Sequence, residues 1–469
     1  MLHPHSTATL KNLGTRMNRR RFLTATGLAL SAAPFHALAC RTENTDSLVS
    51  SSPITDDASH GSYGPLEPVI DQTTGLPLLH LPRNFEYLTF GWTGDPLQDG
   101  APTPGSHDGM GTFSIESDRL LLIRNHELRQ GGQFADRPVY DENAGGGTTT
   151  IEFNTATGSA GSAWASLAGT AVNCAGGPTP WGSWLTCEET VDGPGGDNDY
   201  HHAHGYIFEV PTEDTATAQP LKDMGRFVHE AVAVDPATGI VYETEDRRNS
   251  GFYRFLPTEV NNLAAGGQLE MLALTDRTQA DLRGRQTPFV WHPVSWVSID
   301  DPDPANPSEN SVFSQGFTGG GATFARLEGT WYGNERIYIV STDGGNAEAG
   351  QIWEYDPTQE RLRLIYESPN VDTLNMPDNI CVSPRGGLVL CEDTEPDNFI
   401  RALSIDGSIS PFAQNNVVLD GQIHGFTGDF RNREFAGATF SPDGNWLFFN
   451  AQTPGITFAV TGPWADGTL

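Results

Sequence analysis

Short stretches of alternating apolar and polar residues recur along the chain, and each ends at a tight-turn sequence. The turns VDPATG, VSPRGG and FSPDG, at 234–239, 382–387 and 440–444, precede the strand-like stretches IVYETED, LVLCED and NWLFFNAQ. Another set of short strands ends in proline: GYIFEVP from Gly205, GFYRFLP from Gly251 and GQIWEYDP from Gly350. Recurrent hairpins without helical periodicity are typical of propeller blades. We therefore expect an all-β protein, a β-propeller with irregular blades and loop insertions, and a β-sandwich array remains the alternative.

The N-terminal pattern differs from the rest and predicts export. Met17 opens MNRRRFLTATGLALSAAPFHALAC, in which an arginine pair precedes a moderately apolar stretch that ends in Ala37-Leu38-Ala39. This order is typical of a twin-arginine signal, so we expect the twin-arginine translocase as a partner and cleavage near Ala39. The expected destination is periplasmic or extracellular, and Cys40 leaves a lipoprotein open.

This signal sets the expected domain boundaries. Residues 1–39 form the signal region, with Met17 as the expected true start. Residues 40–79 form a linker or N-terminal extension, and residues 80–469 form the propeller domain. The twin-arginine route carries folded proteins, often with a metal already inserted, so the signal also favours a metalloprotein.

The net charge of the chain excludes some classes of binding partner. The chain has 59 acidic and 27 basic residues, a formal net charge of −32. A surface of this sign repels nucleic acid and anionic membranes and is compatible with cation binding. After residue 40 no stretch is apolar enough to span a membrane. We expect a monomer acting on a small substrate.

The five cysteines are too few and too unevenly placed for a disulfide scaffold. Cys381 and Cys391 flank the turn SPRGG, and with Gly386 as its centre they would face each other across a hairpin. A disulfide and two buried thiols are both open there. Cys187 ends TPWGSWLTCEE beside Glu188 and Glu189, where adjacent negative charge disfavours a reactive thiolate. A cation that neutralised the thiolate and the two carboxylates would make their close approach favourable.

Acidic residues recur where the expected strands end or begin. If these strands emerge at one end of a propeller channel, their carboxylates converge on a metal site. These acidic residues are Glu127 after LLIRNH, Glu188 and Glu189 after WLTC, Glu230 after GRFVH, Glu243 and Glu245 in VYETED, Asp378 in PDNICV, Glu392 and Asp393 after VLC, and Glu434 before FAGATF.

Several of these motifs carry a family resemblance. TPWGSWLTCEE, GRFVHE, RLEGTWY from Arg326, GQIWEY and EFAGATFSPDGNWLFFN occur in an order that resembles the PhoX-type alkaline phosphatases and their shorter relatives. The resemblance runs from about residue 80 onward. It implies a six-bladed propeller that holds Fe³⁺ and Ca²⁺ in a channel cluster, and a metal-assisted phosphomonoesterase reaction. It implies metal ligands at Cys187, Glu188, Glu230, Asp378 and Glu434, with Glu127, Glu245 and Glu392 as further candidates.

The sequence differs from this family at two positions that are expected to bind the substrate phosphate. Pro178 and Met376 stand where the larger phosphatases have basic residues. Asn173, Arg226 and Arg247, with Arg248 beside it, are the expected replacements that stabilise a metal-bound phosphate. Cys187 is expected to act as a ligand and not as a nucleophile.

Two other functions stay open. The hairpin PDNICVSPRGGLVL also resembles calcium-dependent lactonase propellers, in which a single calcium ion serves an ester or lactone substrate. A non-catalytic calcium-binding propeller is the other alternative. Metal content separates the three, because iron with calcium, calcium alone and neither point to different functions.

Overall fold

Antiparallel β-strands make up almost all of the regular structure. The computed structural model describes residues 61–136, 138–213 and 215–469, all within the unit Asp56–Leu469. The expected signal region, Met17, Cys40 and most of the expected linker lie outside these residues. Among the described residues, no helix is long and apolar enough to cross a membrane.

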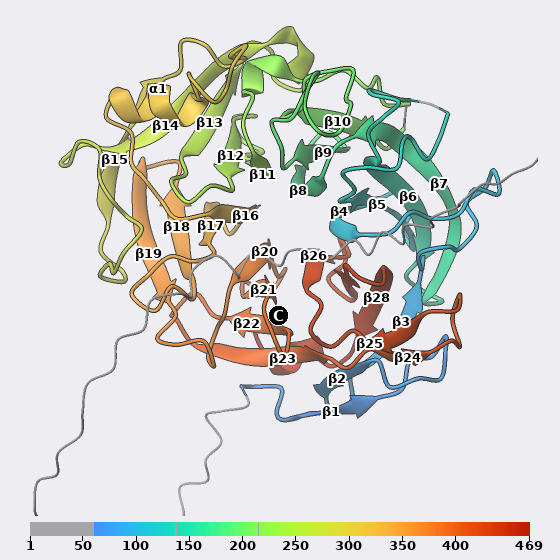
Figure 1. Ribbon diagram of the computed structural model, residues 1–469. Helices are drawn as coiled ribbons and strands as arrows, with labels where there is room; N and C mark the ends of the chain where they lie inside the picture. Colours follow the sequence, from blue (N-terminus) through green and yellow to red (C-terminus); the bar gives the residue numbers. More distant parts are fainter. Residues whose placement is uncertain (1–60, 137, 214) are drawn as a thin grey trace, which may run out of the picture. The chain divides into compact units, whose positions relative to one another are not determined.

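The sheets stand side by side around a common centre, in a propeller-like arrangement (Figure 1). One sheet has β4 (His107–Ser114), β5 (Arg119–His126), β6 (Gly146–Asn154) and β7 (Ser159–Thr170). The next has β8 (Asn173–Pro178), β9 (Ser183–Glu188) and β10 (Ile207–Pro211).

Nine strands join in a single sheet, in the order β11-β12-β13-β14-β15-β19-β18-β17-β16. Where its two halves meet, β15 pairs with β19 at only two positions, His292 with Leu362 and Pro293 with Arg361. The strands are β11 (His229–Val234), β12 (Val241–Glu245), β13 (Phe252–Pro257), β14 (Gly267–Leu274), β15 (His292–Ser298), β16 (Leu327–Gly333), β17 (Arg336–Ser341), β18 (Gln351–Asp356) and β19 (Arg361–Glu367).

The remaining sheets combine strands from both ends of the chain. β3 (Glu86–Phe90) pairs with β28 and so joins the N-terminal part of the described chain to its C-terminal part, which closes the ring. The strands of these sheets are β1 (Leu66–Val69), β2 (Leu79–Pro82), β20 (Pro377–Val382), β21 (Leu388–Glu392), β22 (Phe399–Leu403), β23 (Ile409–Asn415), β26 (Phe435–Phe440), β27 (Leu447–Ala451) and β28 (Ile456–Thr461).

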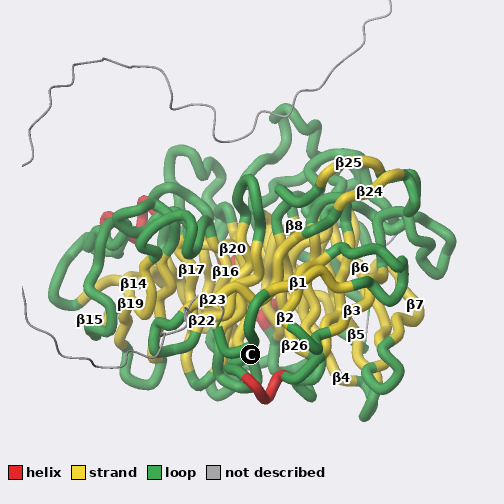
Figure 2. Tube along the Cα trace, turned by 90° about the horizontal axis from the view of Figure 1, so that it is seen from below, coloured by secondary structure: helices red, strands yellow, loops and turns green. Residues whose placement is uncertain are grey.

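Loops cover the strand layer on both of its sides (Figure 2), and a few short elements lie outside the large sheets. They are the hairpin β24 (Val418–Asp420) and β25 (Thr427–Asp429), helix α1 (Val312–Thr318), and 3₁₀ turns at Lys222–Met224, Leu263–Ala265 and Trp464–Asp466. β1 and β2 pair with each other and β2 with β23, so the sheets begin at Leu66, before the expected boundary at residue 80.

Each predicted hairpin is present: VDPATG joins β11 to β12, VSPRGG joins β20 to β21, and FSPDG joins β26 to β27. The proline-ended stretches are β10, β13 and β18. The expectation that Cys381 faces Cys391 was wrong, because Cys381 lies opposite Val389. The turn is centred one residue earlier than expected, at Arg385. Both are buried free thiols.

Six strands line the centre. β4, β8, β11, β16, β20 and β26 contact one another in turn, and β26 contacts β4. Small residues permit this approach: a Cβ on Gly109 would lie 2.6 Å from the Ala175 Cα, and one on Gly329 would lie 2.7 Å from the Asp378 carbonyl oxygen. Apolar side chains fill the spaces between sheets, as where Leu185 and Ile207 share a cluster with Val232 and Phe255.

Candidate metal centre

The six central strands bring acidic residues to one end of the axis. In each of the six central hairpins, the start of the inner strand lies opposite the end of the second strand; His107 faces His126, and Pro377 faces Glu392. Each hairpin also has a register shift just after this point. Bulges of this kind re-aim side chains next to functional sites. Residues at both positions therefore gather at the same mouth.

Acids lie at or directly beside most of these positions, and eight of them form three groups. Within each group, one carboxylate oxygen per residue lies within 4.8 Å of the others. The groups are Asp108, Glu127 and Glu434; Glu189, Glu230 and Asp246; and Glu230, Glu328 and Asp378. Glu230 belongs to two groups, so these two are contiguous.

Burial and mutual repulsion raise the pKa of several of these carboxyls. Burial raises the pKa of Glu230 well above its ordinary value, and Glu328 and Asp378 raise it further. Burial, followed by Asp393 and Asp378, does the same to the pKa of Glu434. Burial and Asp393 raise the pKa of Asp378 to about 7. A cation would replace the protons and remove the repulsion, which is the electrostatic setting of a metal site.

Arg326 is the cation that the structure places against this cluster. Its guanidinium donates to both oxygens of Asp246, at 2.9 and 3.2 Å, and to Glu328. Glu328 and Asp246 raise the pKa of Arg326, so it stays charged. One guanidinium cannot balance three acid groups once their carboxyls are ionised, so bound cations would have to neutralise the remaining charge.

Sequence analysis found about half of the acids in these groups. Glu127, Glu230, Asp378 and Glu434 were predicted, although Glu230 begins a strand and does not end one. Four other acids of these groups were not among the predicted ligands: Asp108, Glu189, Asp246 and Glu328. A signal for two of these exists, because Asp108 and Glu328 share a pattern with Glu230. Each is the second residue of an inner strand and is followed by glycine or alanine.

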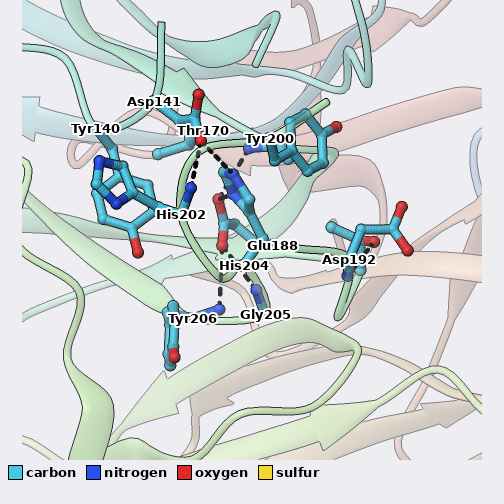
Figure 3. Close-up of polar contacts among 12 residues, drawn as sticks. Tyr140, Asp141, Thr170, Glu188, Asp192, Tyr200, His202, His204, Gly205 and Tyr206 are labelled. Atoms are coloured by element: carbon cyan, nitrogen blue, oxygen red, sulfur yellow. Dashed lines mark hydrogen bonds and ion pairs between the residues drawn. The ribbon is translucent and has the colours of Figure 1, made fainter. Parts of the chain in front are cut away.

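Glu188 has a different environment (Figure 3). Its oxygens accept from the backbone N–H groups of Ala171, Gly205 and Tyr206 and from His204 Nδ1 at 2.6 Å. Although burial opposes charge on His204, Glu188 and Asp141 raise the pKa of this histidine. Through these hydrogen bonds, the Glu188 carboxylate holds a loop against the end of β9.

Glu245 and Glu392 are also engaged with protein groups. Glu245 accepts from the Tyr253 hydroxyl at 2.6 Å and from the Gly251 N–H, and burial raises its pKa to about 7. Glu392 forms a buried ion pair with Arg401, with 2.9 Å between Oε1 and Nε. None of the three acid groups includes Glu188, Glu245 or Glu392.

The two cysteines of this region are buried in the same apolar cluster and differ in which charges lie near them. Cys187 is fully buried with Leu185, two residues before it, in the apolar cluster between two sheets. Cys174 is on the inner strand β8, and after burial the charges that raise its pKa include those of Glu230, Glu189 and Asp108. The Cys174 thiol donates to the His229 and Glu230 carbonyl oxygens, at 3.4 and 3.5 Å, and so lies beside the start of the strand that carries Glu230.

The expected phosphate-stabilising residues differ in how far their side chains are engaged, and Arg247 directly follows Asp246 of the second acid group. The Asn173 side chain bonds to Thr170 and Thr186. Arg226 is buried and donates to backbone carbonyls, including that of His204 at 2.9 Å. Arg247 is exposed. Arg326, in the motif RLEGTWY, was not among the residues predicted to bind phosphate.

Pro178 has no bearing on the acidic end. β8 runs from Asn173 at the acidic mouth to Pro178 at the other, where Pro178 lines a pocket with Val234, Trp331 and Tyr332. Met376 does lie at the acidic end, because its carbonyl accepts from the Asp393 N–H at 3.0 Å. Of the two departures from the family pattern, only Met376 lies near the candidate site.

A model of the family described as alkaline phosphatase PhoX matches residues 61–160 and 144–455. The chain belongs to this family. No curated protein matches the sequence significantly.

Several solved structures resemble the chain in outline. They include a gluconolactonase from Xanthomonas campestris, with 13% identity, a TM-score of 0.34 and coverage of 77% of this chain and 97% of that chain. Virginiamycin B lyase from Staphylococcus aureus has 10% identity, a TM-score of 0.38 and coverage of 80% and 99%. The WD40 propeller domain of Doa1 has 9% identity, a TM-score of 0.37 and coverage of 77% and 95%.

Proposed function

We propose that the protein is an exported, metal-dependent hydrolase of small phosphate monoesters. The observation that carries this proposal is the set of three buried acid groups at one end of the axis, two of them sharing Glu230, in a chain of the PhoX family. Membership of the family supports a phosphatase-type hydrolase. The acids supply the charge that a metal cluster needs.

The donor set favours calcium together with iron. Carboxylate oxygens are the ligands that Ca²⁺ prefers, and a thiolate suits a transition metal. We assign the acids of the three groups as ligands of Ca²⁺ and Fe³⁺, and Cys174 as the thiol of the cluster in place of Cys187. Bound ions of this kind polarise phosphoryl oxygens and offset the charge that develops in phosphoryl transfer.

A side chain of the protein would bind the phosphate group of the substrate. Arg326 is held in a fixed position by Asp246 and Glu328, and a quarter of its side chain is exposed. We propose that it binds a phosphate oxygen of the substrate, the role that sequence analysis gave to Arg226 and Arg247. A guanidinium already anchored by carboxylates loses little entropy when it meets a phosphate.

The proposal includes six blades. The closed ring of six inner strands supports it, as do the six hairpins with the same register shift. The weak connection between β15 and β19 would then be a contact between two blades. Export by the twin-arginine route to the periplasm or the outside is part of the same proposal and rests on the leader sequence from Met17.

Glu230→Gln tests the function, because one substitution alters two acid groups. Protein exported by its native host would be analysed for calcium and iron and assayed with p-nitrophenyl phosphate. We expect loss of metal and a fall in turnover of about 100-fold or more. Glu309→Gln, at an exposed loop acid, is the control and should match the wild type.

Other results would replace the proposal. Calcium without iron, together with hydrolysis of lactones but not of phosphate esters, would indicate the lactonase alternative. Calcium binding without hydrolysis of either class would indicate a non-catalytic propeller. If Glu230→Gln kept its full metal content and turnover, the acid groups would have no part in the mechanism.

A further inference from the structure

Two neighbouring arginines at the acidic mouth have no acidic partner. Arg247 and Arg248 follow β12, which ends at this mouth opposite the start of β11. Both side chains are exposed, and within the described part of the chain neither forms an ion pair or a side-chain hydrogen bond. Acidic residues outnumber basic ones in this chain by 59 to 27. Two adjacent guanidinium groups without a carboxylate therefore form a local excess of positive charge.

Backbone hydrogen bonds place this arginine pair directly beside Arg326. The Arg326 N–H donates to the Arg247 carbonyl oxygen at 2.9 Å, and Ser250 and Phe324 exchange two backbone hydrogen bonds, at 2.9 and 3.1 Å. The Ser250 hydroxyl also accepts from the Leu327 N–H. The loop after β12 is thus fixed to the segment that carries Arg326, which reduces the entropy that the loop would lose on binding a ligand.

Asp343 is the carboxyl group of this sector that lies nearest in the fold to the same backbone. The Thr342 N–H donates to the Arg326 carbonyl oxygen at 2.9 Å, which brings the next residue, Asp343, to the mouth. Burial raises the pKa of Asp343, and the positive charges of Arg326 and Arg248 both oppose this shift. One carboxyl group that is shared with Arg326 cannot neutralise two further guanidinium groups.

The exposed guanidinium groups lie where the rest of a bound substrate would extend. In the proposed complex the phosphate that is hydrolysed contacts Arg326, and the alcohol part of the ester points towards solvent. Arg247 and Arg248 belong to the exposed part of the same mouth. Guanidinium groups bind phosphate and carboxylate oxygens through charge-assisted hydrogen bonds. An anionic group on the alcohol part would therefore gain interactions there that a neutral group would not.

We propose that Arg247 and Arg248 select phosphate esters whose alcohol part carries a second anionic group, a phosphate or a carboxylate. This inference rests on the proposed phosphatase activity and adds the class of its substrate. The strong negative charge of the chain repels such substrates at long range, and the arginine pair would offset this repulsion at the entrance of the site. Arg326 would bind the phosphate that is hydrolysed, and the pair would bind the anionic group that stays on the alcohol product.

Matched substrates test this specificity in metal-loaded protein exported by its native host. Release of inorganic phosphate would be measured with propyl phosphate, 1,3-propanediol bisphosphate and 3-phosphonooxypropanoate, which differ only in the group at the far end of the carbon chain. For the wild type we expect kcat/KM to be about 10-fold higher with either anionic group than with propyl phosphate. The preference should shrink at high salt, which screens exposed charges. In Arg247→Gln/Arg248→Gln it should be lost.

Arg83→Gln, at an exposed arginine that pairs with Glu67, is the control and should keep the preference. A gain with the bisphosphate alone would support the proposal and restrict the second group to phosphate. Equal kcat/KM for the three substrates in the wild type would overturn the inference and leave the phosphatase activity in place. A preference that survives in Arg247→Gln/Arg248→Gln would do the same. If the wild type released phosphate from none of the three, the proposed function itself would be wrong, and the inference with it.

Discussion

The same residue type has opposite roles at neighbouring positions in this protein. Glu188 is surrounded by donors, namely three backbone N–H groups and His204. Glu230 is surrounded by other acids, which raise its pKa. A carboxylate of the first kind is already neutralised by the protein, and one of the second kind needs an added cation. Environment, more than identity, decides which acid is a ligand.

Glu188→Gln is therefore expected to cost stability and not metal. The amide keeps the shape but loses the charge opposite His204 and turns a donor towards backbone N–H groups. Removing one partner of a buried ion pair costs about 3–5 kcal/mol. Thermal unfolding should show a large loss of stability, while metal analysis should show the wild-type content. Loss of a metal ion would instead make Glu188 a ligand.

Arg326→Gln should separate substrate binding from metal binding. Without the guanidinium, Asp246 and Glu328 repel each other in the metal-free protein, which should lower its stability by about 1–2 kcal/mol, allowing for partial exposure. Calcium should restore most of this loss. We expect kcat/KM for phosphate esters to fall about 10- to 100-fold, because a donor to phosphate is lost.

Arg283→Gln is the matched control for this change. Arg283 pairs with Asp281 at an exposed site, where an ion pair contributes about 0–1 kcal/mol. Kinetics with p-nitrophenyl phosphate and melting curves with and without calcium distinguish the two variants. Wild-type kinetics in Arg326→Gln would show that the substrate does not meet this guanidinium.

At the scale of elements, each central hairpin presents acids through its register shift. The turn sequences predicted the hairpins, because Pro, Gly and Asp fix tight turns locally. The shift near the mouth has no local signature, and it determines which side chain points to the axis. Asp108 shares with Glu230 the pattern of an acid at the second position of an inner strand, which is the signal that could have identified it.

Strand alternation explains the two cysteines. Leu185 and Cys187 are two residues apart in β9 and so share the face that packs between sheets. Cys174 lies on β8, next to the axis, a position that becomes evident only when the order of the sheets is known. Cys187 as a metal ligand stays a prediction, and Cys174 is the alternative that the order of the sheets adds.

Gly329→Ala tests the close approach of the inner strands. Its Cβ would lie 2.7 Å from the Asp378 carbonyl oxygen and 2.8 Å from the Ile380 nitrogen, both backbone atoms. β16 and β20 would have to separate, at a cost of about 1–3 kcal/mol. Because Glu328 and Asp378 would move apart with them, metal affinity should fall as well.

Gly284→Ala provides the control, since nothing lies within 4 Å of its added Cβ. We expect this substitution to change stability by less than about 0.5 kcal/mol. Denaturant unfolding and calcium titration would be compared for both variants. If Gly329→Ala keeps the wild-type calcium affinity, the spacing of β16 and β20 does not set the metal site.

At the scale of the whole molecule, the ring converts local pairs into one site. Each hairpin contributes one or two acids, and only the closed arrangement brings those of distant segments together, such as Glu434 with Asp108. The sequence predicted the all-β class, the hairpins and four of these acids. It could not predict the grouping, because grouping depends on which strands are neighbours around the axis.

The assembled acids make the metal-free molecule sensitive to pH. Asp378 has a pKa of about 7 in the folded chain, against an ordinary value of 3.8. Between these pH values the folded state binds more protons than the unfolded state. The free energy of unfolding of the metal-free protein therefore falls as pH rises through this window. Glu230 and Glu434, with strongly raised pKa values, act in the same direction.

Calcium should reverse this dependence, because ions bind the deprotonated carboxylates. Stabilisation by a ligand grows with its affinity, so the calcium-induced rise in Tm should increase from about pH 5 to about pH 8. Calorimetry of chelator-treated and calcium-saturated protein across this range measures both trends. In Glu230→Gln one titrating carboxyl is gone, so both trends should be weaker than in the wild type. A metal-free Tm that climbs with pH would mean that the acids are ionised and paired within the protein, and the site would then have no need of a cation.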